Sequence, residues 1–197
     1  MKKDVDKYFE GYETRVFIKP NGKTGKEFVY TGDYYHIDAD LKARNRIKLF
    51  SFLFFSAYLA VYLIAGFSHS AGNLAGPTGI VSLVILIPMV YWLLGLIEHV
   101  TTKEYMEARK FHYGLKRISK CLSGIFFFTL AQIAAEIIVL ILRRDIVFDI
   151  TIEILFFCMI ACEALLTYVN RHYLKKIEID IVPHDSVPHN SLGEPTA

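Results

Sequence analysis

Four long apolar runs dominate the pattern of hydrophobic and polar positions along the chain. They cover Leu49–Phe67, Ile80–Ile97, Leu122–Leu142 and Ile150–Val169. An α-helix needs about 20 apolar residues to cross a hydrocarbon layer of about 30 Å. The pattern therefore predicts an all-α integral membrane protein with four transmembrane helices, at about 49–67, 80–97, 122–142 and 150–169.

Shorter, alternating patterns lie outside the runs. Apolar and charged residues alternate over Tyr12–Ile18, and Lys26–Tyr30 follows a turn signal at Pro20–Lys23, which predicts a β-hairpin. Three isoleucines alternate with acidic residues over Ile177–Ile181. Because an isolated hairpin is only marginally stable, we predict that this tail segment adds a third strand to it. Its acidic face would complement the basic residues of the hairpin.

These patterns divide the chain into three parts. Residues 1–48 form a head, in which the hairpin is followed by a helix that leads into the first span, with Asp38 as its predicted N-cap. Residues 49–169 form the transmembrane domain. Residues 170–197 form a tail with one short strand and a disordered, Pro-containing end.

The distribution of charge predicts the orientation in the membrane. Of the 22 Lys and Arg residues, 11 precede the first run, six lie between the second and third, and three follow the fourth. Basic residues mark the cytoplasmic side, so we expect both termini and the central loop to be cytoplasmic.

The first apolar run lies behind a charged head, so we expect no cleavable signal peptide. Short outer connections and the absence of an Asn-x-Ser/Thr acceptor favour a prokaryotic cell membrane.

Composition and charge favour lipids over nucleic acid as the binding partners of this chain. The chain is 53% hydrophobic, with a mean hydropathy of +0.34, and its net charge of only +2 gives no support for nucleic-acid binding. The stretch from Tyr105 to Ile118 places basic residues among apolar ones at helical spacing, a pattern typical of helices at a membrane surface. We therefore predict contacts with anionic lipids of the inner leaflet, made by Arg109, Lys110, Lys116 and Arg117.

A few polar residues inside the third and fourth runs are the candidate site. Gln132 and Glu136 share one helical face, Glu153 lies just beneath the outer boundary, and Glu163 lies in the inner half of its run. Carboxyl groups are costly in hydrocarbon and normally face a bundle interior or a hydrated cavity. The first interpretation is a proton- or cation-coupled pathway. The second is that Gln132 and Glu136 bond between helices, while Glu153 extends outward to Arg143 or Arg144.

The sequence shows no nucleophile beside a base, no dinucleotide fingerprint and no complete set of metal ligands. We therefore predict no enzyme activity, no cofactor and no metal. The cytoplasmic segments are the most elaborate part of the chain, so our first functional prediction is an accessory or interaction protein of the cell membrane. The alternative is a small proton- or cation-coupled transporter or channel that uses the intramembrane carboxylates. Ala131 and Ala135 would allow close helix approach in a homo-oligomer or against a membrane-protein partner.

Overall fold

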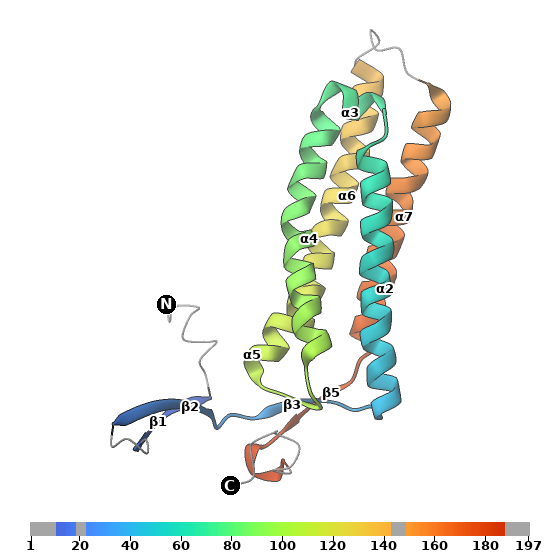
Figure 1. The fold of residues 1–197 in the computed structure, drawn as a ribbon. Coiled ribbons are helices and arrows are strands. Elements are labelled where there is room, and N and C mark those ends of the chain that lie inside the picture. Colours follow the sequence, from blue (N-terminus) through green and yellow to red (C-terminus); the bar gives the residue numbers. More distant parts are fainter. Residues whose placement is uncertain (1–10, 19–22, 143–148, 188–197) are drawn as a thin grey trace.

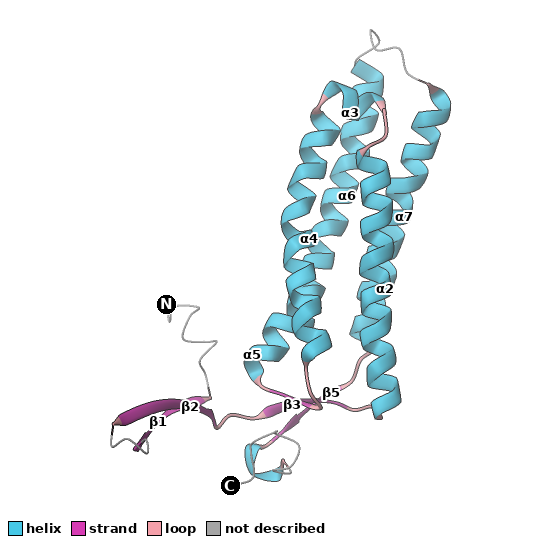
Figure 2. Ribbon diagram, viewed as in Figure 1, coloured by secondary structure: helices cyan, strands magenta, loops and turns pink. Residues whose placement is uncertain are grey.

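The computed structural model describes residues 11–18, 23–142 and 149–187, and its main feature is a bundle of four long helices (Figures 1 and 2). Each helix is long and apolar enough to cross a membrane, and each predicted run coincides with one helix, apart from Phe67 just beyond the first. The helices are α2 (Leu41–Gly66), α4 (Pro77–Thr101), α6 (Arg117–Leu142) and α7 (Ile150–Lys175).

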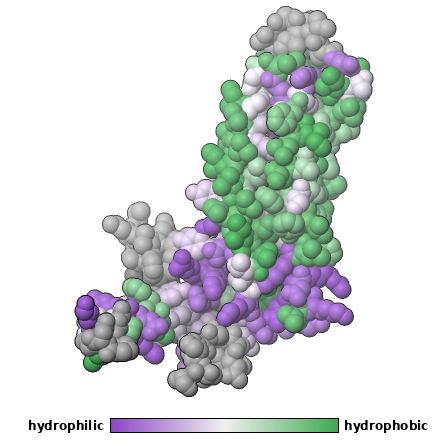
Figure 3. Space-filling model, in the orientation of Figure 1, coloured by the Kyte–Doolittle hydropathy of each residue, from purple (hydrophilic) through white to green (hydrophobic). Residues whose placement is uncertain are grey.

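The bundle has two different ends. At one end the short helix α3 (Ala71–Ala75) connects α2 to α4; we call this the α3 end. At the other, the sheet end, lie the five strands of the described residues. Figure 3 shows an apolar surface along the helices and hydrophilic side chains concentrated at the sheet end. Exposed leucines, isoleucines and phenylalanines make up this apolar belt, among them Leu63, Leu83 and Ile138.

Two helices begin at aspartate N-caps. The Asp40 carboxylate accepts a hydrogen bond from the backbone N–H of Ala43 at 2.7 Å, and Asp149 caps α7 in the same way. The predicted cap at Asp38 is wrong. Asp38 continues the preceding strand instead, because its backbone N–H donates to the carbonyl oxygen of Glu178.

The predicted third strand exists, but its predicted partner is wrong. Strands β1 (Tyr12–Ile18) and β2 (Thr24–Tyr30) form a separate two-stranded hairpin. The tail strand β5 (Ile179–Val182) pairs antiparallel with β3 (Tyr34–Ile37), which the sequence pattern did not reveal. The two-residue strand β4 (Tyr105–Met106) pairs with the other edge of β3. The acidic residues of this tail segment, Glu178 and Asp180, therefore do not face the basic residues of the hairpin.

Apolar burial explains this pairing. Ile37, Met106 and Leu115 form a small core that Ile177 and Ile179 cover, so this tail segment gains more by packing these two isoleucines beneath the bundle than by joining the exposed hairpin. The three-stranded sheet consequently joins the head, the central loop and the tail. Three predicted features lie outside the described residues: the turn at 20–22, the connection with Arg143 and Arg144, and the end of the tail.

Aromatic rings attach the hairpin to the rest of the molecule. Tyr30 is buried between the rings of Tyr12 and Tyr34, and its hydroxyl oxygen accepts a hydrogen bond from the backbone N–H of Ala108. The Tyr12 hydroxyl donates to the carboxylate of Glu107. The predicted surface helix between residues 105 and 118 is therefore interrupted: β4 is followed by α5 (Ala108–Phe111) and a π-helical turn (His112–Lys116) before α6.

Candidate functional site

All four polar residues predicted for the site lie in the interior of the bundle. Gln132 is 1% exposed, Glu136 and Glu163 are 0% exposed, and Glu153 is 4% exposed. Helical spacing explains this, because Gln132 and Glu136 share the buried stripe of α6, and Glu153 and Glu163 share that of α7.

Glu136 and Glu153 meet at the α3 end. The backbone N–H of Ala71 donates to Glu153 Oε1 at 2.6 Å, and the next N–H, that of Gly72, donates to Glu136 Oε1 at 2.7 Å. The Thr78 hydroxyl donates to Glu136 Oε2 at 2.8 Å. Because two consecutive backbone amides bind the two carboxyl groups, these groups lie close enough to interact electrostatically. The amides at the start of α3, which have no partner within that helix, therefore bind acidic side chains of the chain itself.

A second polar group lies one helical turn further into the bundle. Gln132 Nε2 donates to Ser82 Oγ at 3.0 Å, and the Tyr62 hydroxyl donates to the Ser82 carbonyl oxygen at 2.8 Å. A groove of about 390 Å³ between α2 and α4 is lined in part by Tyr62 and Ser82. Two residues of this polar group therefore line an opening in the side of the bundle.

Glu163 lies near the middle of the bundle. The Tyr58 hydroxyl donates to Glu163 Oε2 at 3.4 Å, and the rings of Tyr58 and Tyr62 stack with centroids 6.2 Å apart. Tyr58 thus connects Glu163 to the Gln132–Ser82–Tyr62 group. From Glu153 to Glu163, side chains of all four long helices contribute to one buried polar series.

The carboxyl groups of this series have no cationic partner within residues 11–18, 23–142 and 149–187. Glu104, which pairs with His36 and Arg44, lies at the sheet end and away from this series. One oxygen of Glu153 and one of Glu163 also have no hydrogen-bond partner there. Whether Glu153 reaches Arg143 or Arg144 lies outside the described residues.

Comparison with known proteins adds nothing to this geometry. No family model, curated protein or solved structure matches the chain. The function is therefore inferred from the residues of this chain alone. Buried carboxyl groups linked by hydroxyl and amide groups can hold and pass a proton or bind a small cation. In the part of the chain that the structure describes, no three His, Cys, Asp or Glu side chains gather as a metal site.

The four residues predicted to contact anionic lipids lie close together at the sheet end. Arg109 and Lys116 are exposed, and Lys110 is half-buried beside a polar cavity of about 220 Å³. The Arg117 guanidinium lies over the ring of Tyr113, 4.4 Å from its centroid. This cation–π contact holds Arg117 against the protein, whereas Arg109 and Lys116 point outward.

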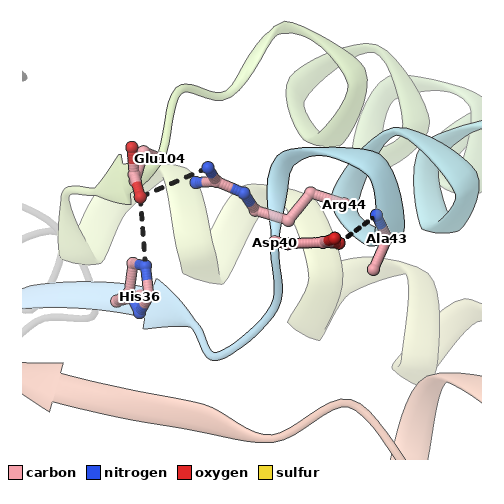
Figure 4. A network of polar contacts seen from close by, with 5 residues as sticks. All are labelled: His36, Asp40, Ala43, Arg44 and Glu104. Atoms are coloured by element: carbon pink, nitrogen blue, oxygen red, sulfur yellow. Dashed lines mark hydrogen bonds and ion pairs between the residues drawn. The ribbon is translucent and has the colours of Figure 1, made fainter.

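Sequence reasoning missed a polar network at the sheet end (Figure 4). Glu104 accepts from Arg44 at 3.2 Å and lies 3.5 Å from His36 Nε2. These three residues come from the central loop, the start of α2 and β3, so nothing in their sequence spacing connects them. The one sequence signal for this network was the surplus of basic residues in the head. Such a surplus favours an ion pair with an acidic residue from a neighbouring segment.

Proposed function

We propose that this chain is a multi-pass protein of the cell membrane that moves protons or small cations along the interior of its helix bundle. Its four apolar helices would cross the bilayer, with both termini in the cytoplasm. The observation that carries the proposal is the buried polar series from Glu153 to Glu163. Three buried carboxyl groups without a cationic partner among the described residues are expensive in hydrocarbon, and a stable anchor needs none of them.

Flux through reconstituted vesicles tests the proposal. Purified protein is placed in vesicles that contain a pH-sensitive dye, and a potassium diffusion potential supplies the driving force. We expect wild-type protein to carry protons inward and Glu163→Gln to lower the rate at least tenfold, because the amide cannot take up and release a proton. Glu178→Gln is the matched control, since Glu178 is exposed at the sheet end. Equal flux in wild-type and empty vesicles, for protons and for sodium or potassium, would reject the proposal.

An interaction role is the second candidate, and the hairpin favours it. Val16, Ile18 and Phe28 lie on the hairpin face that also carries the anchored Tyr12 and Tyr30, yet they are 64%, 76% and 67% exposed. Exposed apolar side chains that adjoin one another are typical of protein-binding surfaces. In this function the head and loop would bind a partner at the inner face, while the helices serve as an anchor.

Site-specific crosslinking in native membranes tests this second function. A photoreactive residue at Val16 should crosslink to one defined protein, while the same group at Glu13, on the opposite hairpin face, should not. Crosslinks of equal yield and pattern from both positions would show that the hairpin has no specific partner.

A further inference from the structure

The contacts between α2 and α7 fix how these two antiparallel helices are aligned. Tyr58 of α2 meets Glu163 of α7, and seven residues toward the α3 end Ala65 packs with Phe156. The same step of seven residues toward the sheet end leads to Ser51 on α2 and to Asn170 on α7. This alignment places the two residues at the same level of the bundle, about 10 Å from Glu163 along its axis.

Ser51 and Asn170, which we call the pair, are buried polar residues at one level of the bundle that the site described above does not use. Both are 0% exposed, and both lie on the interior stripes of their helices. Ser51 Oγ and both polar side-chain atoms of Asn170 have no hydrogen-bond partner among the described residues. A buried polar atom left without a partner is destabilising, because it has lost its hydrogen bonds to water. Apolar residues at these positions would make a more stable bundle.

The pair also lies next to polar groups at the sheet end. Lys48 precedes Ser51 by one helical turn, and its Nζ donates to the carbonyl oxygens of Val100 and Thr102 at 3.0 and 2.6 Å. His99 is 1% exposed, interacts electrostatically with Lys48, and has no partner for either ring nitrogen in the described part of the chain. Polar groups therefore continue from Glu163 to the sheet end.

We infer that Ser51 and Asn170 are a proton-relay site between Glu163 and the sheet end of the bundle, with His99 as the next group. A hydroxyl and an amide both donate and accept hydrogen bonds, so the pair can hold a water molecule on which the proton travels. A proton taken up by Glu163 leaves its carboxyl group as a carboxylate, crosses the gap of about 10 Å along water molecules that include the one held by the pair, and reaches a His99 nitrogen, which then releases it at the sheet end. The inference rests on the proposed function and narrows its substrate to the proton.

Asn170→Leu tests the relay by a readout that separates it from a structural role. We expect proton flux to fall at least tenfold while the melting temperature in detergent stays equal or rises, because leucine replaces unpartnered polar atoms at similar volume. Asn45→Leu, at an exposed position of α2, is the control and should keep wild-type flux. Undiminished flux in Asn170→Leu would overturn the inference. So would a fall in melting temperature together with flux, since that result marks a structural residue.

A labelling experiment decides the matter even if the wild-type protein carries no protons. In a variant with alanine at positions 121, 158 and 162, Ser51→Cys is exposed to a charged thiol reagent that does not cross membranes. A hydrated relay predicts that it reacts at least tenfold faster than Ile85→Cys, a position equally buried in the apolar core. Equal rates would overturn the relay. Absent flux together with fast labelling would reject the transport function but retain a hydrated site at Ser51.

Discussion

At the scale of single residues, Gly72 makes room for the acidic cluster, the two carboxyl groups of Glu136 and Glu153 at the α3 end. A Cβ atom at this position would lie only 2.0 Å from Glu136 Oε2 and from Thr78 Oγ1. We therefore expect Gly72→Ala to displace the Glu136 carboxyl group and to lower the free energy of unfolding by about 1–3 kcal/mol. Gly124→Ala is the control, because its Cβ would meet nothing within 4 Å, and it should be neutral or stabilising by up to about 1 kcal/mol. Equal unfolding midpoints for the two variants would contradict this account.

A pH effect at the hairpin also belongs to single residues. Burial, and then the hydrogen bond to the Glu107 carboxylate, raise the pKa of Tyr12 above its ordinary value near 10. A raised pKa means that the docking contribution of Tyr12 is complete below about pH 10 and is lost as the pH rises further. Spin labels at Thr14 and Arg109 should therefore move apart above pH 10. The movement should be smaller in Tyr12→Phe, and an unchanged pH dependence in that variant would count against the assignment.

The candidate residues could be predicted from sequence, but their partners could not. Spacing along α6 and α7 was enough to place Gln132, Glu136 and Glu163 on buried stripes, because helical periodicity is local. The partners of Glu136 and Glu153 are backbone amides of α3. That helix has five residues and no apolar period, so its position depends on how α2 and α4 pack rather than on any local pattern.

At the scale of elements, the three-stranded sheet should open independently of the bundle. Ile37 is 5% exposed in the small core that joins β3, β4 and β5. Replacing it with alanine should cost about 2–4 kcal/mol, and this cost falls on the sheet. We expect faster hydrogen exchange in β3 and β5 and unchanged protection in α6. Faster exchange throughout all four long helices would show that sheet and bundle unfold together.

The strands show where prediction from sequence failed and why. The hairpin was predictable because its two strands are neighbours in the chain and alternate in polarity. The pairing of β5 with β3 joins residues about 145 positions apart, and β3 is only four residues long. A segment of that length carries too little pattern to be distinguished from a loop. The pairing of β3 with β5 depends on the apolar core beneath the bundle, and this core exists only in the folded molecule.

At the scale of the whole molecule, charge and shape together predict the proposed orientation in the membrane. The described basic residues gather at the sheet end, while the α3 end carries His69 and the buried acidic cluster. If the sheet end is cytoplasmic, the polar series begins at the outer surface with Glu153 and Glu136. Protons would then enter from the outside and leave beside Lys48 and His99.

Thiol labelling of intact cells tests this orientation. In the variant with alanine at positions 121, 158 and 162, we expect His69→Cys to react with an impermeant reagent added outside. Lys176→Cys should react only after the cells are opened. Both positions are exposed in the folded protein, so burial cannot account for a difference between them. The opposite pattern would invert the topology, and the proposed direction of proton movement with it. Reaction at both positions in intact cells would mean that the four helices do not separate the two ends of the molecule, and a pathway across the bilayer would then have no basis.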